Sequence, residues 1–321
     1  MGYSRIAGTG SYLPPKIVTN HDIAAMGIDT NHDWVVARTG IESRRVAEGE
    51  TTSDLAAHAA RKAMEAAGVT AHDIDLIVLA TTTPDMLLPS TAALLQAKLG
   101  VRPGAAVFDV QAVCTGFMYA ITVAEAMVSR GQFKCALVIG AETLTRYLNW
   151  KDRNSCVLFG DGAGAAILKP ADQPGILSSH LHADGNLSPI LRLNASFAGG
   201  KIHGNPFVEL DGQAVFKVAV RVLEECAREA LEHNRVPVEQ LDWLVPHQAN
   251  LRIISAAADR LGVPMSRVVT TVQRHGNTSA ASAILALDEA VRDGRIKPGQ
   301  LVMLQGVGGG MTWGSVLVRW G

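Results

Sequence analysis

The two halves of this chain carry the same sequence landmarks in the same order. An apolar run with aspartate at its second position occurs at Ile74–Val78 and again at Leu241–Val245, and the segment that follows each run closes on Leu-Gly-Val. Cys114 then opens an apolar segment that ends at a glycine 17 residues later, and Asn277 opens another of the same length. Several landmarks that recur in one order indicate duplication of a single structural unit.

Each unit alternates short apolar runs with longer segments of helical period. We predict strands at Ile74–Ala80, Ala105–Val110, Ala136–Gly140, Leu241–Val245, Val268–Val272 and Leu301–Leu304. We predict helices at Ser53–Ala67, Ser90–Leu99, Thr115–Ser129, Gln213–Glu232, Ala249–Leu261 and Thr278–Arg292. Continuous apolar strands separated by helices indicate largely parallel sheets covered on both faces. The chain is therefore predicted to be an α/β protein of two halves, residues 1–172 and 173–321, without a flexible linker between them.

Composition and charge narrow the class of protein. Apolar residues make up 48% of the 321 residues and charged residues only 18%, so we expect a large buried core. The formal net charge of −1 gives no general indication of binding to nucleic acid or to an anionic membrane. The N-terminus lacks a signal-peptide pattern, no apolar run has the length of a membrane span, and the four cysteines form no C-x-x-C pair. We therefore expect a cytoplasmic protein without disulfides.

Cys114 lies where a predicted strand and a short turn end and an apolar helix begins. The start of a helix presents unpaired N–H groups and a partial positive charge, which lower the pKa of a thiol and favour the thiolate nucleophile. The alternative is a small buried hydrophobic residue, and position alone leaves both interpretations open. Cys135, Cys156 and Cys226 lie in or beside strand-like runs or inside a helix, and we interpret them as buried hydrophobic residues.

His247 and Asn277 each stand between an extended segment and a helix. Ligands of open α/β sheets collect beyond the carboxyl ends of the strands, so Cys114, His247 and Asn277 can converge on one cleft between the two halves. Taken alone, Asn277 is equally well explained as a helix N-cap. His180 and His182 would share one face of a strand, but no third ligand lies nearby in the sequence, and we interpret them as surface residues rather than a metal site.

Two glycine-rich segments call for different interpretations. Gly160–Ala166 is followed by a short strand-like run, whereas a dinucleotide fingerprint needs a helix there, so we predict a tight turn between two strands. Gly306–Gly314 follows a predicted strand and contains three consecutive glycines. Its backbone N–H groups could stabilise an oxyanion, with a plain tight loop as the alternative.

Taken together, these segments resemble β-ketoacyl-acyl-carrier-protein synthase III, the initiating condensing enzyme of bacterial type II fatty-acid synthesis in the thiolase superfamily. The resemblance runs essentially from end to end of the chain. The matching motifs are GTGSYLP at Gly8–Pro14, DWVVARTGI at Asp33–Ile41, the segment around Cys114, FGDGAGAA at Phe159–Ala166, PHQANLRII at Pro246–Ile254, RHGNTSAAS at Arg274–Ser282 and GGGMTWGS at Gly308–Ser315. It implies a five-layered α-β-α-β-α arrangement of two duplicated halves and a homodimer.

The resemblance also implies a set of site residues and a reaction. The catalytic triad would be Cys114, His247 and Asn277, with an oxyanion hole from the backbone N–H groups of Cys114 and Gly309. The implied coenzyme A contacts are Trp34, Arg38, Arg153, Phe216 and Asn250. The implied basic docking face for an acidic carrier protein consists of Lys217, Arg221, Arg252 and Arg260, for which an ordinary solvated face is the alternative. The reaction joins an acyl-coenzyme A primer to malonyl-acyl-carrier protein and needs no metal or redox cofactor.

Two departures from the family pattern bear on the primer, the acyl group that is first transferred. Val113 precedes the nucleophile where the family usually has a smaller residue, and Leu87-Leu88-Pro89 stands where many members place an aromatic residue that reaches across the dimer. The less bulky Leu88 suggests an acyl pocket that admits primers longer than acetyl. Three alternatives remain: a thiolase-fold acyltransferase of secondary metabolism, a non-catalytic acyl-binding or scaffold protein, and a papain-like protease, which also uses Cys, His and Asn.

Overall fold

The computed structural model describes residues 2–321 and contains two large mixed sheets. The first sheet has the order β1-β7-β6-β4-β5. Its strands are β1 (Tyr3–Tyr12), β4 (Leu76–Ala80), β5 (Ala106–Val110), β6 (Ala136–Glu142) and β7 (Gly162–Ala171). Strand β4 is parallel to both of its neighbours, β5 and β6, whereas β7 is antiparallel to β6 and to β1. Parallel pairing is therefore confined to β4, β5 and β6, so the sheet is mixed rather than largely parallel as predicted.

The second sheet repeats this pairing pattern. Its order is β11-β12-β13-β8, with strands β8 (Ile176–Ala183), β11 (Trp243–Pro246), β12 (Leu301–Gly308) and β13 (Thr312–Arg319). As in the first sheet, a parallel pair, β11 and β12, is extended by two antiparallel strands. The turn between β7 and β8 contains residue 172, and a division of the chain there remains a prediction.

The strand predicted at Val268–Val272 is wrong. Only Val268 bridges the sheet, through a single parallel contact with Leu244, and Val272–His275 is the short helix α9. The fully buried side chain of Gln248 explains the difference. Its amide nitrogen donates to the carbonyl of Val269, and its amide oxygen accepts from the N–H groups of Thr271 and Val272. A side chain therefore satisfies the backbone groups that a sheet ladder would have paired.

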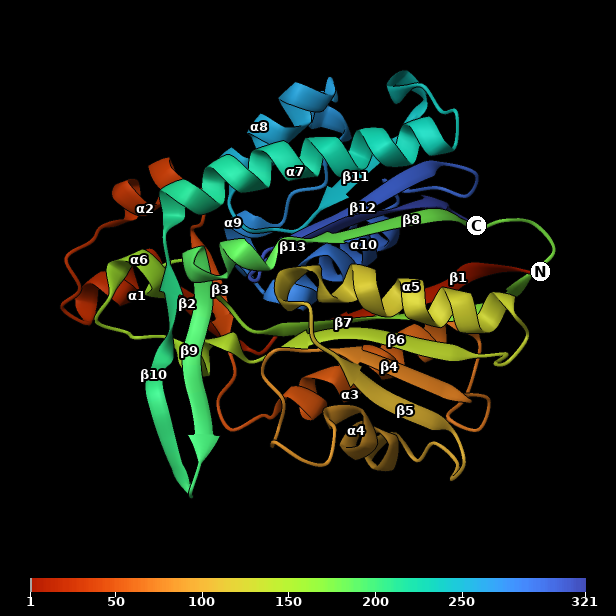
Figure 1. Ribbon diagram of the computed structural model, residues 1–321, viewed down its shortest axis with the longest axis horizontal. Helices are drawn as coiled ribbons and strands as arrows, with labels where there is room; N and C mark the ends of the chain where they lie inside the picture. Colours follow the sequence, from red (N-terminus) through yellow and green to blue (C-terminus); the bar gives the residue numbers. More distant parts are fainter. Residues whose placement is uncertain (1) are drawn as a thin grey trace.

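Helices form three layers around the two sheets (Figure 1). The helices are α1 (Asn20–Ala25), α2 (His32–Thr39), α3 (Thr52–Ala67), α4 (Thr91–Leu99), α5 (Gly116–Ser129), α6 (Arg153–Cys156), α7 (Gly212–His233), α8 (Leu251–Leu261) and α10 (Ser282–Arg292). Helices α5 and α10 lie between the sheets, α3 and α4 cover the outer face of the first sheet, and α7 and α8 cover that of the second. This is the predicted α-β-α-β-α arrangement. Within residues 2–321, no helix combines the length and the apolar character that crossing a membrane requires.

Glycines bring the central helical layer close to the strands. A Cβ atom added to Gly140 on β6 would lie 2.3 Å from the carbonyl oxygen of Ala280. The segment predicted to be a tight turn between two strands is instead mostly strand, because β7 begins at Gly162. A Cβ on Gly164 would lie 2.5 Å from the side chain of Ile284 on α10, so this glycine permits close packing rather than a turn.

Two small ribbons stand apart from the layers. The first pairs β2 (Lys16–Thr19) with β3 (Ser43–Val46). The second pairs β9 (Leu191–Ala198) with β10 (Lys201–Leu210) and projects from the body as an arm (Figure 1). The arm exposes Phe197 and Ile202, whose exposed fractions are 58% and 64%.

Candidate active site

Cys114, His247 and Asn277 line one cavity between the two halves of the fold. All three are buried, with exposed fractions of 4%, 2% and 6%. The remaining wall is largely apolar and includes Phe159 and Met311. Convergence of these three residues on one cleft was expected from the sequence, and the structure brings them together in this cavity.

Cys114 lies in a 3-10 turn, Val113–Thr115, directly before α5. Val113 has a φ of 50°, a strained value for a β-branched residue, and it turns the chain sharply into the nucleophile. Strand β12 packs against this turn, since a Cβ on Gly308 would lie 2.6 Å from the backbone nitrogen of Cys114. The hydroxyl of Thr312 donates to the carbonyl of Ala112 at 3.0 Å and ties the glycine loop to the same turn.

The expected thiolate is not the resting state of this cysteine. Burial raises the pKa of the Cys114 thiol to about 12, and this effect exceeds the lowering by a hydrogen bond with Ser279. The negative charge of Glu142 raises the pKa of the thiol further. The start of the helix was visible in the sequence, whereas the complete burial of the sulfur was not.

His247 is held in one tautomer by its neighbours. Its Nδ1 lies 2.5 Å from the hydroxyl oxygen of Ser282, and the same oxygen accepts from the backbone N–H of Gln248 at 3.1 Å. Because the Ser282 hydroxyl has no other acceptor for its hydrogen among the described residues, we assign that hydrogen to Nδ1, and the neutral ring then carries its own hydrogen on Nε2. Burial lowers the pKa of His247 to about 3, so the ring stays neutral at physiological pH. It can therefore donate one hydrogen bond from Nε2.

Asn277 is oriented in a comparable way. Its side-chain oxygen accepts from the backbone N–H of Ser279 at 2.9 Å, and its backbone N–H donates to the carbonyl of Leu158 at 2.8 Å. With the oxygen engaged, the amide nitrogen is the group left to donate into the cavity. Sequence reasoning missed both Ser279 and Ser282. The run Thr278-Ser279-Ala280-Ala281-Ser282 carried a signal, but serines at the start of a helix are first interpreted as caps.

A second, wider cleft adjoins the cavity and gathers the residues expected to contact coenzyme A. Its lining includes Trp34, Arg38, Arg153, Phe216 and Asn250. The guanidinium carbons of Arg38 and Arg153 lie 4.4 and 5.0 Å from the centre of the Trp34 ring. Asn250 lines both the cleft and the cavity, so the two spaces adjoin at this residue.

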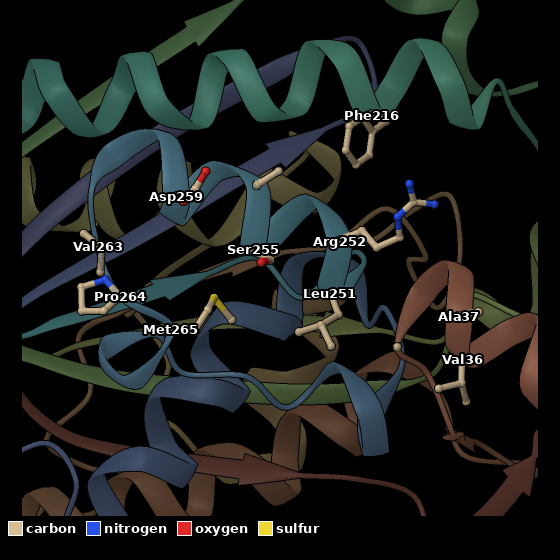
Figure 2. A pocket seen from close by; sticks show the side chains of 12 residues that line it. Val36, Ala37, Phe216, Leu251, Arg252, Ser255, Asp259, Val263, Pro264 and Met265 are labelled. Atoms are coloured by element: carbon tan, nitrogen blue, oxygen red, sulfur yellow. The ribbon is translucent and has the colours of Figure 1, made fainter.

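The four basic residues of the expected docking face differ in their surroundings. Arg221 forms an ion pair with Glu225, and Arg260 forms one with Glu224. Lys217 and Arg252 instead line the wide cleft, and no ion pair within residues 2–321 includes either. Figure 2 shows Arg252 at the end of a shallow groove, with the ring of Phe216 nearby. The guanidinium carbon of Arg252 lies 5.7 Å from the centre of that ring.

Three other predictions have mixed outcomes. Leu88 does not line the cavity of its own chain and is 80% exposed. A Cβ on Gly309 would lie 2.8 Å from the carbonyl oxygen of Leu191, so this glycine lies against the start of the arm. His182 is partly exposed as expected, but only 11% of the His180 side chain is exposed, and both histidines contact Glu229. Among the residues described, no group of three or more ligands is suited to a metal ion.

Comparison with known proteins identifies the family. The family model of the 3-oxoacyl-[acyl-carrier-protein] synthase III C-terminal region matches residues 231–320, and the model of 3-oxoacyl-[acyl-carrier-protein] synthase III matches residues 108–185. The chain is 42% identical to the crystal structure of 3-oxoacyl-[acyl-carrier-protein] synthase III from Aquifex aeolicus, over 99% of this chain and 100% of that one, with a TM-score of 0.94. This chain belongs to the 3-oxoacyl-[acyl-carrier-protein] synthase III family.

Two other solved structures are similarly close to this chain. A synthase III from Thermus thermophilus is 42% identical over 99% of both chains, with a TM-score of 0.90. The priming β-ketosynthase of the R1128 polyketide pathway is 37% identical over 99% of this chain and 96% of that one, with a TM-score of 0.93. The protein is thus a thiolase-fold condensing enzyme, an acyltransferase of fatty-acid synthesis, and the scaffold and protease alternatives are set aside.

Proposed function

We propose that Cys114 carries the primer acyl group and that His247 and Asn277 activate the malonyl thioester. The primer arrives as an acyl-coenzyme A, and the second substrate is malonyl-acyl-carrier protein. The convergence of a buried thiol, an oriented imidazole and an oriented amide on one cavity carries this proposal. Acyl transfer and decarboxylation at such a site call on hydrogen-bond donors, so the scheme needs no metal or redox cofactor.

In the first step the sulfur of Cys114 attacks the thioester carbonyl of the primer. The backbone N–H groups of Cys114 and Gly309 stabilise the tetrahedral oxyanion. The close approach of Gly308 to the nitrogen of Cys114 supports this role, because it brings the glycine loop next to the nucleophile. Coenzyme A then leaves, and the largely apolar walls protect the acyl-enzyme from water.

In the second step the malonyl thioester carbonyl lies between His247 and Asn277. Nε2–H of the imidazole and the side-chain N–H of the amide both donate to that carbonyl oxygen and stabilise the enolate formed as carbon dioxide departs. Neutral histidine suits this role, since its pKa of about 3 keeps the same hydrogen in place over the physiological range. The enolate carbon then attacks the acyl-cysteine and gives the 3-ketoacyl product.

The wide cleft suits coenzyme A. Arg38 and Arg153 lie over the Trp34 ring, so an adenine ring can take the place of one guanidinium in the stack while the other holds phosphate. Arg153 pairs with Asp29, whose side chain is 97% exposed, and such a pair is weak enough to open for a ligand. Asn250, at the junction of cleft and cavity, then contacts the pantetheine arm.

The carrier protein approaches from the side of the basic residues. Lys217 and Arg252 border the wide cleft and have no carboxylate partner among residues 2–321, so they are available to an acidic surface, whereas Arg221 and Arg260 are partly neutralised. The shallow groove in Figure 2 continues from Arg252 along α8 and exposes Met265. This apolar floor next to free cations suits the amphipathic surface of a carrier protein.

A second copy of the chain completes the acyl pocket. Strand β5 lies at the edge of its sheet, which leaves its outer backbone groups for another strand. Asp109 on β5 accepts from the N–H groups of Thr91 and Ala92, so the exposed Leu87 and Leu88 lie in the loop next to this edge. Pairing of two β5 strands would carry Leu88 towards the cavity of the partner. The homodimer and the cytoplasmic location both belong to this proposal.

The primer depends on the space that this dimer leaves. The enclosed cavity of one chain measures about 80 Å³, which suits a short acyl group. A primer longer than acetyl needs extra room beside Leu88, as its modest size suggests. Relative turnover of acetyl- and octanoyl-coenzyme A tests this point, and a strong acetyl preference counts against the longer primer.

Mass spectrometry of the intact protein after exposure to acyl-coenzyme A tests the proposed function. We expect the acyl mass on the peptide that contains Cys114, and its loss on addition of malonyl-acyl-carrier protein with formation of the 3-ketoacyl product. An acyl group on another residue would contradict the proposal.

A second candidate function is priming of a polyketide pathway, favoured by the 37% identity with the R1128 priming β-ketosynthase. The two functions differ in the carrier protein rather than in the chemistry. Condensation rates with the carrier proteins of fatty-acid and of polyketide synthesis separate them. We expect the fatty-acid carrier to react faster, and a reversed preference would favour the second candidate.

A further inference from the structure

Ser279 has an unusual backbone conformation and follows Asn277 by two residues. Its φ is 48°, in the left-handed region that favours glycine, and it begins the 3-10 turn Ser279–Ala281 that leads into α10. A residue other than glycine keeps such a value only where its surroundings hold it in place. The contacts that hold Ser279 therefore also determine the geometry of this turn.

The backbone N–H of Ser279 orients the amide of Asn277. It donates to the Asn277 side-chain oxygen at 2.9 Å. The backbone of Asn277 is held separately, because its N–H donates to the carbonyl of Leu158 at 2.8 Å and its carbonyl accepts from the N–H of Gly160 at 3.0 Å. The position of Asn277 therefore does not depend on Ser279, whereas the direction of its amide does.

The hydroxyl of Ser279 is anchored on strand β6. It donates to Oε1 of Glu142 at 3.0 Å, and both residues are fully buried. The turn comes this close because Gly140, two residues earlier on β6, leaves room for the backbone of Ala280. A hydrogen bond in the protein interior, away from competing water, ties the turn firmly to the strand.

Glu142 is itself held by the loop that follows β4. Both of its side-chain oxygens accept from the backbone N–H of Thr82, and Oε2 also accepts from the hydroxyls of Thr81 and Thr83. Burial raises the pKa of this carboxyl group. A carboxyl group offers an acceptor oxygen in either protonation state, so the hydrogen bond from Ser279 does not require a charged carboxylate.

We propose that Glu142 is a positioning residue for condensation and acts through Ser279 on the amide of Asn277. This rests on the proposed function, in which that amide donates to the malonyl thioester carbonyl. The bond to Glu142 holds Ser279 at positive φ, so its N–H points at the Asn277 oxygen and the amide nitrogen is left to donate. Because φ is a rotation about the N–Cα bond, release of the anchor lets the peptide group that carries this N–H turn away. The amide can then present its oxygen to the enolate instead.

The imidazole is oriented by a separate contact. The Ser282 hydroxyl lies 2.5 Å from Nδ1 of His247, and Glu142 takes no part in it. Loss of the anchor should therefore disturb the amide and leave the imidazole in place. The effect on decarboxylation should pass through Asn277 alone, which distinguishes positioning from a general loss of packing.

Decarboxylation of malonyl-acyl-carrier protein by the full-length protein tests the anchor, with release of labelled carbon dioxide as the measurement. Ser279→Ala removes the hydroxyl and keeps the backbone N–H, and it should slow decarboxylation on the order of 10-fold while acylation of Cys114 changes little. Ser315→Ala is the matched control, because it removes another fully buried serine hydroxyl, which donates to the carbonyl of Cys226 away from the cavity. This control should keep the wild-type rate, and an equal loss there would contradict the proposal.

Ser279→Gly separates the anchor from a direct role of the hydroxyl in the chemistry. This variant also lacks the hydroxyl, but glycine adopts positive φ without strain, so it should recover most of the rate that Ser279→Ala loses. If Ser279→Gly were as slow as Ser279→Ala, the hydroxyl itself would be required and the proposal would be wrong.

Two variants of Glu142 test the acceptor. Glu142→Leu removes it and should be as slow as Ser279→Ala. Glu142→Gln keeps an acceptor oxygen without the charge, so it should lose far less, and an equal loss in the two variants would contradict the proposal. If Glu142→Leu does not fold, Glu142→Gln and the Ser279 variants still decide the matter.

Asn277→Ala shows whether the anchor acts through the amide. In a protein that already lacks the amide, adding Ser279→Ala should cause no further loss of decarboxylation, whereas a further loss of about 10-fold would show that Ser279 acts on another group. If Asn277→Ala alone kept the wild-type rate, the proposed role of the amide would fall, and the anchor with it. If Asn277→Ala were slow and Ser279→Ala were not, only the anchor would be overturned.

Discussion

The two halves of the molecule have matching strands, β6 and β12, which start alike and differ where they reach the site. Asp75 donates its backbone N–H to the carbonyl of Cys135 at 3.1 Å, and Asp242 donates to the carbonyl of Leu301 at the same distance. Counted from these anchors, Gly140 and Glu142 on β6 correspond to Gly306 and Gly308 on β12.

The first of these positions is glycine in both halves, Gly140 and Gly306, whereas the second is Glu142 in one half and Gly308 in the other. Both Gly140 and Gly306 let the turn before a central helix approach the strand, with would-be Cβ contacts of 2.3 Å to the oxygen of Ala280 and 2.9 Å to Cα of Thr115. The halves differ two residues further along these strands. Gly308 on β12 leaves room for the backbone of Cys114, whereas Glu142 on β6 accepts a hydrogen bond from the hydroxyl of Ser279. We infer a division of labour in which the N-terminal half supplies the nucleophilic sulfur, and the C-terminal half supplies the oriented donors for the malonyl thioester.

The largest expected effect comes from the sulfur itself. Cys114→Ala should abolish acyl transfer and condensation, because no other side chain in the cavity can form the thioester. Decarboxylation of malonyl-acyl-carrier protein should continue, since its donors lie in the other half. Release of labelled carbon dioxide measures this partial reaction, and its loss in the variant would break the comparison.

Removal of the imidazole donor should slow decarboxylation and spare acylation, the reverse of the effect expected for Cys114→Ala. His247→Ala should slow decarboxylation by about 100- to 1000-fold, the usual cost of losing one oriented donor to a developing oxyanion. Acylation of Cys114 should change little. A loss confined to acylation would show that the imidazole serves the sulfur instead.

Ser282→Ala tests the orientation of the same imidazole and should have a smaller effect on decarboxylation than His247→Ala. Without the hydroxyl at Nδ1, the ring is free to adopt either tautomer, so we expect about a 10-fold fall in decarboxylation. Ser282→Thr restores the hydroxyl and should restore most of the rate. If Ser282→Thr were as slow as Ser282→Ala, packing rather than the hydrogen bond would be responsible.

The free energy of unfolding should also depend on pH through His275, a buried residue of the C-terminal half. Burial lowers the pKa of His275 to about 4, so below pH 6.5 the unfolded chain binds a proton that the folded protein does not. The free energy of unfolding should therefore fall by about 1.4 kcal/mol per pH unit for this residue between pH 6.5 and 4. Glu142, whose pKa is raised by burial, acts in the opposite direction. Urea unfolding at pH 6.5 and 5 should show a shallower dependence in His275→Gln, and an unchanged slope would contradict the assignment.

Periodicity and the duplicated landmarks were sufficient for most strands and helices and for the meeting of the three site residues, because they depend on local pattern, whereas the five layers were implied by the family resemblance. The sequence was insufficient where a side chain forms the hydrogen bonds that the local pattern would assign to a neighbouring strand. Gln248 takes the hydrogen bonds of the strand expected at Val268–Val272. The prediction of a lowered pKa for the Cys114 thiol was wrong, because a helix start can be seen in the sequence and burial cannot. Ser279 and Ser282 resembled helix caps, although they orient Asn277 and His247.

Acylation of the double variant His247→Ala/Asn277→Ala tests the division of labour most directly. Mass spectrometry follows the acyl group on Cys114 over time after mixing with acetyl-coenzyme A. If His247 and Asn277 serve only the malonyl thioester, acyl-Cys114 should form at close to the wild-type rate. Failure of the folded double variant to acylate would contradict this, because the imidazole or the amide would then be needed for the thiol as well.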